Sequence, residues 1–430
     1  MPSSIKISKE SFRAFRHRNY LIYWVTMLVS MTGTWMQSVA VAWLVLTLSS
    51  SAVVLGIVNA LNFLPSLFLS LFAGVLIDRL SKRKILILTQ SLEAIQAIVF
   101  WWLVWSKSIV LWEIYVLTFI LGTINAFDQP ARQAFVTEMV PDEDVTNAIG
   151  LNSLLFNAAR TLGPMVAGVA IAAMGMAPSF FLNAISFLFV IVGFLFMKKE
   201  QLRVSMAPIR RSLFQDLKEG FIFIAQTPLI VALIIALFFA GIFGYNFTTI
   251  IPLLAKFVLH GSSRTLGVLS SAMGAGSMVG ALLMSGLARP SKRVLYAAAF
   301  LFGFCEVLMV FSPHYFLLAL LVGLMGLTGI IYLVSTNAML QLGSPPHLRT
   351  RVISVYVLLL VGVTPIGAFF TGYLADRIGV LNTIFIEGLL CLLGVFLSLL
   401  YLRKKQMFTF YGNVRLGDSI INALGFHKEL

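Results

Sequence analysis

Long apolar stretches recur along nearly the whole of this 430-residue chain, and each is close to the length that a helix needs to cross a membrane. About 20 residues of α-helix span the hydrocarbon core of a bilayer. Hydrophobic residues make up 59% of the sequence and charged residues 11%, whereas soluble domains typically carry about 25% charged residues. So few charged residues could not cover a water-facing surface. The sequence therefore predicts an all-α, polytopic membrane protein.

Twelve segments of suitable length can be placed on the sequence. The predicted spans are residues 20–48, 52–77, 85–105, 109–136, 145–174, 178–197, 228–257, 264–288, 293–311, 314–341, 350–375 and 380–402. The longest polar interval, 198–218, divides them into six and six. The resulting order is an N-terminal segment 1–19, a six-helix half 20–197, a linker 198–227, a second half 228–402 and a tail 403–430. Within the linker, residues 212–226 have the amphipathic pattern of an interfacial helix, with core packing as the alternative.

The distribution of Lys and Arg predicts the orientation. If the N-terminus is cytoplasmic, 26 of the 31 basic residues fall in cytoplasmic segments, 4 fall outside, and Arg160 lies within a span. Cytoplasmic loops of membrane proteins carry such an excess of basic residues. Both termini are therefore expected in the cytoplasm. This pattern also accounts for the net charge of +14, so we expect no nucleic-acid partner.

Signatures of enzymes and metal sites are missing from the sequence. It contains no GxxxxGK[ST] phosphate loop and no H-E-x-x-H motif, and its five His residues are scattered. Its two cysteines, Cys305 and Cys391, lie inside apolar runs and have no zinc-type spacing. An intramembrane enzyme would need a clustered nucleophile and base, or metal ligands. We therefore expect no catalytic residues, no metal and no cofactor.

The two halves carry similar short motifs at equivalent places. LSKRKIL at 80–86 follows the second span, and PSKRVL at 290–295 follows the eighth. The fifth span of each half is rich in glycine and contains a proline, Pro164 or Pro365. Transporters built from parallel repeats bind their substrate near the middle of the membrane, between the halves.

The segment GVLIDRLSKRK at 74–84 resembles the loop motif between helices 2 and 3 of the Major Facilitator Superfamily. Ser81 replaces the second glycine of that motif. The chain is also similar to a bacterial branch containing enterobactin-type siderophore exporters and macrolide efflux proteins, through SFRAFRHRNYLIYW at 11–24 and the block 130–168. The resemblance implies the superfamily fold, twelve transmembrane helices in two six-helix halves. It also implies a bacterial inner (cytoplasmic) membrane location and, often, proton-driven export.

The resemblance further implies a gate at the 74–84 loop. In that reading Asp78 interacts with a neighbouring helix terminus, and Arg79 pairs with an acid near the end of helix 4. The alternative is a basic loop that only fixes orientation. The predicted gating residues, including two from the Gly-Pro pattern of the fifth helix, are Gly74, Asp78, Arg79, Lys82, Arg83, Gly163 and Pro164.

Ionisable groups within spans are costly and are treated as functional by default. Asn125, Asp128, Gln129 and Arg132 recur at helical spacing and share one face of the fourth span. Asp128 is expected either to pair with Arg79 or to take up a proton.

Buried acids occur at comparable places in the two halves. Glu93 and Glu306 lie in the third and ninth spans, and Glu387 lies in the twelfth. They are expected to be structural hydrogen-bonding groups, with proton coupling as the alternative. The candidates for proton coupling are thus Asp128, Glu93 and Glu306.

Arg160 lies about 24 Å along the fifth span and is therefore deep in the membrane. Our hypothesis is that it faces the central cavity and attracts anionic or catechol-like groups. The alternative is a structural partner of a neighbouring carbonyl or acid. In the superfamily, helices 1, 4, 7 and 10 line the cavity. The remaining cavity candidates, each also compatible with simple packing, are Trp35, Gln37, Asn125, Asp128, Tyr245, Asn246, Tyr332 and Asn337.

These features predict a secondary active transporter rather than an enzyme. The predicted function is proton-coupled export of an amphipathic small molecule, a siderophore or a drug, by alternating access. The alternative is a lipid or lysophospholipid transporter of the same fold. The expected partners are a small-molecule substrate, membrane lipids and protons, and we expect a monomer.

Overall fold

The structure, a computed structural model, describes residues 9–203, 213–285, 291–311 and 314–423, and these form helices without strands. A short 3-10 helix, η1 (Lys9–Arg16), precedes the first half. The helices of the N-terminal half are α1 (Arg18–Ser49), α2 (Ala52–Arg79), α3 (Lys82–Trp105), α4 (Leu111–Glu138), α5 (Asp142–Met174) and α6 (Ala177–Leu195). A single 3-10 turn, η2 (Lys199–Gln201), and the linker helix α7 (Leu213–Gln226) lead to the second half.

Two spans of the C-terminal half are interrupted by π-helical turns. The first span of this half consists of α8 (Pro228–Phe239), η3 (Ala240–Gly244), α9 (Phe247–Leu253) and η4 (Leu254–Val258). The fifth consists of α13 (Pro346–Val357), η5 (Leu358–Gly362) and α14 (Thr364–Ile378). The others are α10 (Ser263–Ser285), α11 (Lys292–Met309), α12 (Tyr315–Leu342) and α15 (Val380–Ala423). Such π turns often occur at functional sites.

The prediction of twelve spans is confirmed. Within the described residues, eleven helical segments are long and apolar enough to cross a membrane. The twelfth is α11, which carries three charged residues, Lys292, Arg293 and Glu306. It packs against α12 and α15 inside the same bundle, as a spanning helix would.

Equivalent ends in the two halves are built alike. The serine of each SKR motif, Ser81 or Ser291, immediately precedes the third helix of its half. Ser291 accepts a hydrogen bond from Val294 N at 3.2 Å, which caps that helix, whereas the side chain of Ser81 makes no such bond. Helices α5 and α14 both end at a glycine with positive φ, Gly175 and Gly379. Residues with a Cβ rarely adopt this backbone conformation. These matches support the predicted internal repeat.

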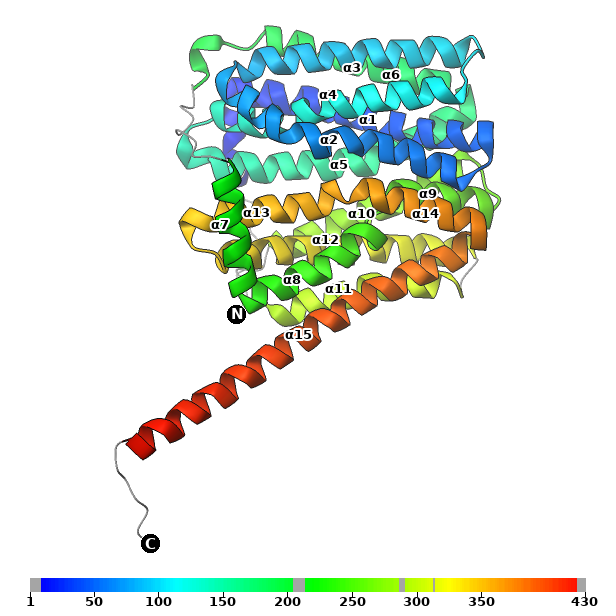
Figure 1. Ribbon diagram of the computed structural model, residues 1–430. Helices are drawn as coiled ribbons and strands as arrows, with labels where there is room; N and C mark the ends of the chain where they lie inside the picture. The colour runs from blue at the N-terminus through cyan, green and yellow to red at the C-terminus, as the bar shows by residue number, and fades with distance from the viewer. Residues whose placement is uncertain (1–8, 204–212, 286–290, 312–313, 424–430) are drawn as a thin grey trace.

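The bundle has two ends, which we name for what they carry. The linker face holds the end of α2, the end of α4 and the helix α7, which runs across the bundle in Figure 1. The hairpin face holds the short turns after α1, α3 and α5. The halves contact each other mainly through α5 against α10 and α2 against α14.

Small residues allow these helices of different halves to approach closely. A Cβ added at Gly168 would lie 3.0 Å from Gly267 Cα, and one added at Gly372 would lie 2.5 Å from Ala52 O. Membrane helices commonly pack through small residues because there the backbones can touch. Both contacts lie toward the hairpin face.

The last helix is longer than predicted. The sequence placed the end of the twelfth span at 402 and assigned 403–430 to a tail, but α15 continues to Ala423. In Figure 1 its final part leaves the bundle and extends beyond it. Polar residues after the span are compatible with helix, so loss of hydropathy marks the edge of a membrane and not the end of a helix. Residues 424–430 lie outside the described part of the chain.

Candidate functional site

A cavity of about 300 Å³ lies between the two halves. Its walls come from α1, α2 and α5 on one side and from the first, second, fourth and fifth spans of the C-terminal half on the other. Apolar and aromatic side chains dominate the lining, with a few hydroxyl groups such as those of Ser38, Ser270 and Thr364. Concave sites of this composition are the usual binding places for small molecules.

Arg160 contributes the positive charge of this cavity. Because α5 begins at Asp142 and has 33 residues, Arg160 lies just past its middle, about 27 Å along the axis. Its Cζ lies 5.7 Å from the ring centroid of Trp35 and 5.6 Å from that of Phe247. Trp35 belongs to α1 and Phe247 to α9, so the guanidinium lies between aromatic rings of different halves.

Tyr245 is fixed in the cavity wall by two contacts. Its hydroxyl donates to Gly329 O at 2.8 Å, and its ring stacks on Phe302 with centroids 5.0 Å apart. The residue follows the π turn η3, whose last residue is Gly244. A Cβ at Gly244 would lie 2.4 Å from the Phe302 ring, so the glycine allows this close packing.

A second cavity, of about 600 Å³, lies on the linker side of the first. The two cavities share Ile330 and Leu333 in their walls. The second is lined by Asn337 and Gln341 of α12 and reaches Arg349 near the start of α13. The hollow between the halves therefore leads toward the linker face.

At the hairpin face the halves are joined by polar contacts. Asp376 of α14 accepts hydrogen bonds from Ser51 Oγ at 2.6 Å and from Ala52 N at 2.7 Å, at the start of α2. Deeper along α2, Asn59 Nδ2 donates to Thr248 O at 3.1 Å. Lys256 Nζ donates to Leu46 O at 3.2 Å. The central cavity is therefore closed off from this face.

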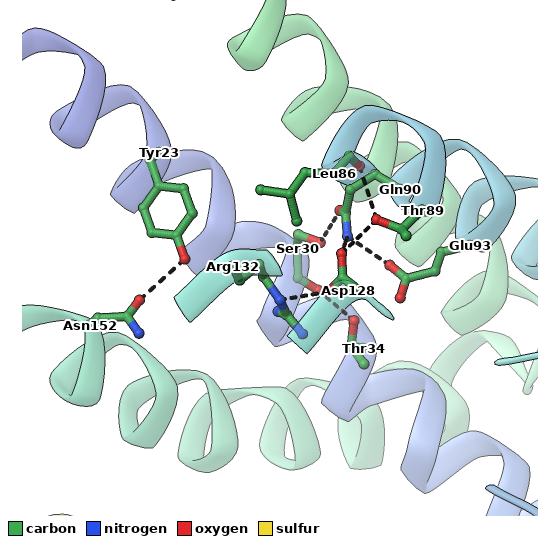
Figure 2. Close-up of polar contacts among 10 residues, drawn as sticks. All are labelled: Tyr23, Ser30, Thr34, Leu86, Thr89, Gln90, Glu93, Asp128, Arg132 and Asn152. Carbon is green, nitrogen blue, oxygen red and sulfur yellow. Dashed lines mark hydrogen bonds and ion pairs between the residues drawn. The ribbon is translucent and has the colours of Figure 1, made fainter. Parts of the chain in front are cut away.

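A polar network lies inside the N-terminal half, among α1, α3 and α4 (Figure 2). Thr89 Oγ1 donates to Asp128 Oδ1 at 2.7 Å, and Gln90 Nε2 donates to the same oxygen at 3.2 Å. Gln90 Nε2 also donates to Glu93 Oε2 at 2.8 Å. Arg132 Nε lies 2.6 Å from Asp128 Oδ2. Asp128 is fully buried and Glu93 is 4% exposed, so the pair is shielded from water.

The network was only partly anticipated. The helical spacing correctly brought Asp128 and Arg132 together, and they form an i, i+4 ion pair. The proposed partner Arg79 cannot be compared, because the side chains of Asp78 and Arg79 lie outside the described part of the chain. The role of Gln90, which links the two carboxyl groups, was missed; a glutamine inside an apolar span was the available signal.

The acids of the C-terminal half are also buried. Glu306 and Glu387 are both 0% exposed. Thr371 Oγ1 donates to Glu387 Oε1 at 2.5 Å. Neither acid lines the cavity between the halves.

Other residues of the predicted gate form contacts within their own half. Lys82 Nζ lies 2.9 Å from Glu138 Oε1, and the two residues are 7% and 8% exposed. Arg83 Nε donates to Phe194 O at 2.8 Å, at the end of α6. The acid at the end of α4, Glu138, therefore pairs with Lys82 in this structure. Gly74 lies near the end of α2 and is half-buried.

The Gly-Pro pair of α5 lies beside the cavity. A Cβ at Gly163 would lie 2.5 Å from Trp35 Cβ, so the glycine allows α5 to pack against α1. Pro164 lines the cavity directly.

Some predicted cavity residues lie elsewhere in this structure. Trp35, Arg160 and Tyr245 line the central cavity and Asn337 lines the adjacent one. The structure places Gln37, Asn125, Asp128, Asn246 and Tyr332 outside both linings.

Three of these residues, Gln37, Asn246 and Tyr332, make their contacts inside a single half. Gln37 Nε2 donates to Gln96 Oε1 at 3.0 Å, and its own Oε1 accepts from Asn183 at 2.8 Å. Asn246 Nδ2 donates to Ile242 O at 2.6 Å. Tyr332 is 1% exposed and packs in the core of the C-terminal half.

The expectation that the fourth helix lines the cavity is wrong in this structure, because α4, which carries Asn125 and Asp128, contributes no residue to the lining. For the first, seventh and tenth spans, knowing that the helix lines the cavity did not show which of its sides does.

Comparison with known proteins shows which family the chain belongs to. The family model for transmembrane secretion effectors matches residues 9–408. The chain belongs to this family. It lies within the Major Facilitator Superfamily, as the loop motif at 74–84 implied. The chain is therefore a multi-pass membrane transporter.

Curated relatives of this secretion effector family member are bacterial transporters. It is 26% identical over 379 residues to the staphyloferrin A transporter of Staphylococcus aureus, covering 85% of this chain and 92% of the relative. It is 22% identical over 385 residues to macrolide efflux protein A of Streptococcus pyogenes, covering 89% and 95%. It is 26% identical over 379 residues to the multidrug efflux pump Tap of Mycolicibacterium fortuitum, covering 84% and 91%.

Solved structures show the same fold. A bacterial homologue of the human lysosomal transporter Spinster, inward-facing and unoccupied, gives a TM-score of 0.71 at 12% identity over 92% of this chain and 98% of that one. The nucleoside transporter NupG gives 0.71 at 11% identity over 89% and 99%. At these identities the likeness concerns the fold alone.

Proposed function

We propose that this protein exports an amphipathic small molecule, a siderophore or a drug, by alternating access. The observation that carries the proposal is the cavity of about 300 Å³ between the halves, lined by aromatic side chains and one arginine. The curated relatives, which are named for staphyloferrin A, for macrolides and for several drugs, support export of this class of molecule.

The orientation follows from the basic residues. The linker face carries Lys82, Arg83 and Lys84 at the start of α3, and the positive-inside rule assigns such a face to the cytoplasm. The cavity adjoining this face would then be reached from the cytoplasm, while the closed hairpin face points outward. This is the arrangement that an exporter needs in order to load its cargo, and we assign the protein to the bacterial inner membrane with both termini cytoplasmic.

We further propose that protons drive the cycle through Glu93 and Asp128. The two carboxyl groups share the side-chain amide of Gln90, and only Arg132 supplies a compensating charge in this network. Buried charges are costly unless they are paired. A single proton on Glu93 would balance the network, and its loss would unbalance it. Such a group can link protonation to the packing of α1, α3 and α4.

Everted membrane vesicles test the proposal directly. Vesicles containing the protein should accumulate staphyloferrin A, a macrolide or another amphipathic solute when a proton gradient is imposed, and vesicles without it should not. Dissipating the gradient should stop accumulation. If the protein instead moved a fluorescent lysophospholipid and accumulated no solute, it would be a lipid transporter and the proposal would be wrong. Solute accumulation that does not depend on the proton gradient would show that export is not coupled to protons.

A further inference from the structure

The charge of Arg160 is not balanced by the protein. Among the described residues, none accepts a hydrogen bond from its guanidinium or forms an ion pair with it, and none of those lining the cavity is acidic. Asp128, a buried acid of the same half, is paired with Arg132 and lies outside the cavity lining.

The contacts that Arg160 does make leave its hydrogen-bonding capacity unused. Trp35 and Phe247 approach the guanidinium at 5.7 and 5.6 Å, within cation–π range. Aromatic faces stabilise a cation without accepting its N–H groups in the guanidinium plane. Guanidinium has five N–H donors in a planar fork that fits carboxylate, sulfonate or phosphate oxygens.

The rest of the lining has no formal charge. Hydroxyl groups and apolar side chains surround the arginine, including Ser38, Ser270 and Met273. A cationic molecule in this cavity would meet a like charge in surroundings that screen it poorly. An uncharged molecule would leave the guanidinium desolvated and unpaired, which is also costly.

We propose that the cargo is an amphipathic organic anion whose acidic group binds Arg160 while its apolar body lies against Trp35, Phe247 and Tyr245. This inference rests on the proposed export function and narrows its cargo by charge. Because Trp35 and Phe247 come from different halves, the anion binds where the halves separate during transport. The anionic group of a lipid would offer the same chemistry as that of a free solute, so both sources have to be compared.

Two xanthene dyes of opposite charge provide the test. Carboxyfluorescein is anionic and rhodamine 123 is cationic, and the two have similar ring systems. Binding of each to the purified full-length protein in detergent is measured by fluorescence anisotropy. The wild type should bind carboxyfluorescein at least about tenfold more tightly than rhodamine 123, as expected for hydrogen bonds to a charged group. Equal binding of the two dyes, or tighter binding of rhodamine 123, would overturn the inference.

Variants locate the effect. Arg160→Gln should lose the preference for carboxyfluorescein, Arg160→Glu should reverse it, and Arg160→Lys should retain part of it. Arg264→Gln removes the same charge from an exposed position on α10 and should bind as the wild type does. An unchanged preference in folded Arg160→Glu protein would refute the assignment. If the variants do not fold, the wild-type comparison of the two dyes still decides.

Transport separates this inference from the proposed function. Everted vesicles that accumulate carboxyfluorescein but not rhodamine 123 would support both. Binding of carboxyfluorescein through Arg160 without accumulation would contradict export while leaving the site in place. Accumulation of rhodamine 123 alone would support export and overturn the anionic cargo. Movement of NBD-labelled phosphatidylglycerol across the bilayer, with carboxyfluorescein neither bound nor moved, would identify a lipid as the source of the anion.

Discussion

The carboxylate of Asp376 caps the first turn of α2, with its Oδ1 2.7 Å from Ala52 N. Asp376 belongs to the C-terminal half and Ala52 to the N-terminal half, so a helix cap joins the two. The Ser51 hydroxyl and the Val53 N–H donate to the same carboxylate at 2.6 and 3.3 Å. Carboxylates are favoured at helix N-termini, where backbone N–H groups lack partners. This cap must break whenever the hairpin face opens.

Replacing Asp376 with Ala should make that opening easier. Loss of a helix cap costs about 1–2 kcal/mol, or roughly 5–30-fold in an equilibrium. A cysteine at Ser38, in the cavity, should then react several-fold faster with an impermeant maleimide added at the hairpin face. Glu113→Ala is the matched control, because Glu113 Oε2 accepts from Val110 N at 3.0 Å on the same face but within one half. Equal labelling rates in the two variants would argue against the Asp376 cap acting as a latch, that is, as a contact that holds the two halves together at the hairpin face.

Breaking the Lys82–Glu138 ion pair should destabilise the N-terminal half. The two residues are 7% and 8% exposed, and removal of one partner of a buried pair costs about 3 kcal/mol or more. Glu138→Gln should therefore lower the melting temperature in detergent, and the exchange Lys82→Glu with Glu138→Lys should restore most of it. Arg203→Gln, which breaks the more exposed 3.6 Å pair with Asp142, should change it little. A melting temperature unchanged by Glu138→Gln would show that the pair contributes nothing.

Glu93→Gln should uncouple transport from the proton gradient. Glutamine keeps the shape and can still bond to Gln90, but it cannot take up or release a proton. We expect cargo binding and passive exchange to persist while gradient-driven accumulation in everted vesicles falls to the level of passive exchange. Glu306→Gln is the comparison, because Glu306 is equally buried in the other half. If only Glu306→Gln removes the dependence on the gradient, coupling belongs to the C-terminal half.

The spans were predictable because hydropathy depends on composition. The twelve segments needed no contact information, and the SKR motifs at Ser81 and Ser291 pointed to two similar halves. Even α11 was recognised, although it carries the three charged residues Lys292, Arg293 and Glu306. The π turns at η3 and η5 were not predicted, because the glycines within them and Pro365 just after η5 mark a weak point in a helix without specifying the kind of turn.

The site was harder to predict because membrane helices are apolar on every side. In a soluble protein, polar residues would have shown the outer face of each helix. Here Gln37 and Asn246 are polar and yet bind inside one half, whereas Phe247 is apolar and lines the cavity. Arg160 could be placed in depth by counting residues, but its two aromatic neighbours come from helices distant in the sequence. The Asp376 cap was missed for the same reason, since only the folded bundle brings it to α2.

Alternating access requires the halves to separate at the hairpin face in every cycle. Ser51→Cys combined with Asp376→Cys places one thiol on each half at the latch, and the native Cys305 and Cys391 are buried. A cleavable bifunctional methanethiosulfonate would link the introduced pair. Ser106→Cys with Ser108→Cys provides a link within one turn of the N-terminal half, where the two hydroxyls lie 2.8 Å apart.

The deciding measurement is the initial rate of solute uptake into everted vesicles containing the Ser51→Cys, Asp376→Cys protein, before linking, after linking and after reduction. Uptake should stop when the halves are linked and return on reduction, while the linked Ser106→Cys, Ser108→Cys protein should keep its rate. Undiminished uptake with the halves fully linked at the hairpin face would contradict transport through the cavity between them.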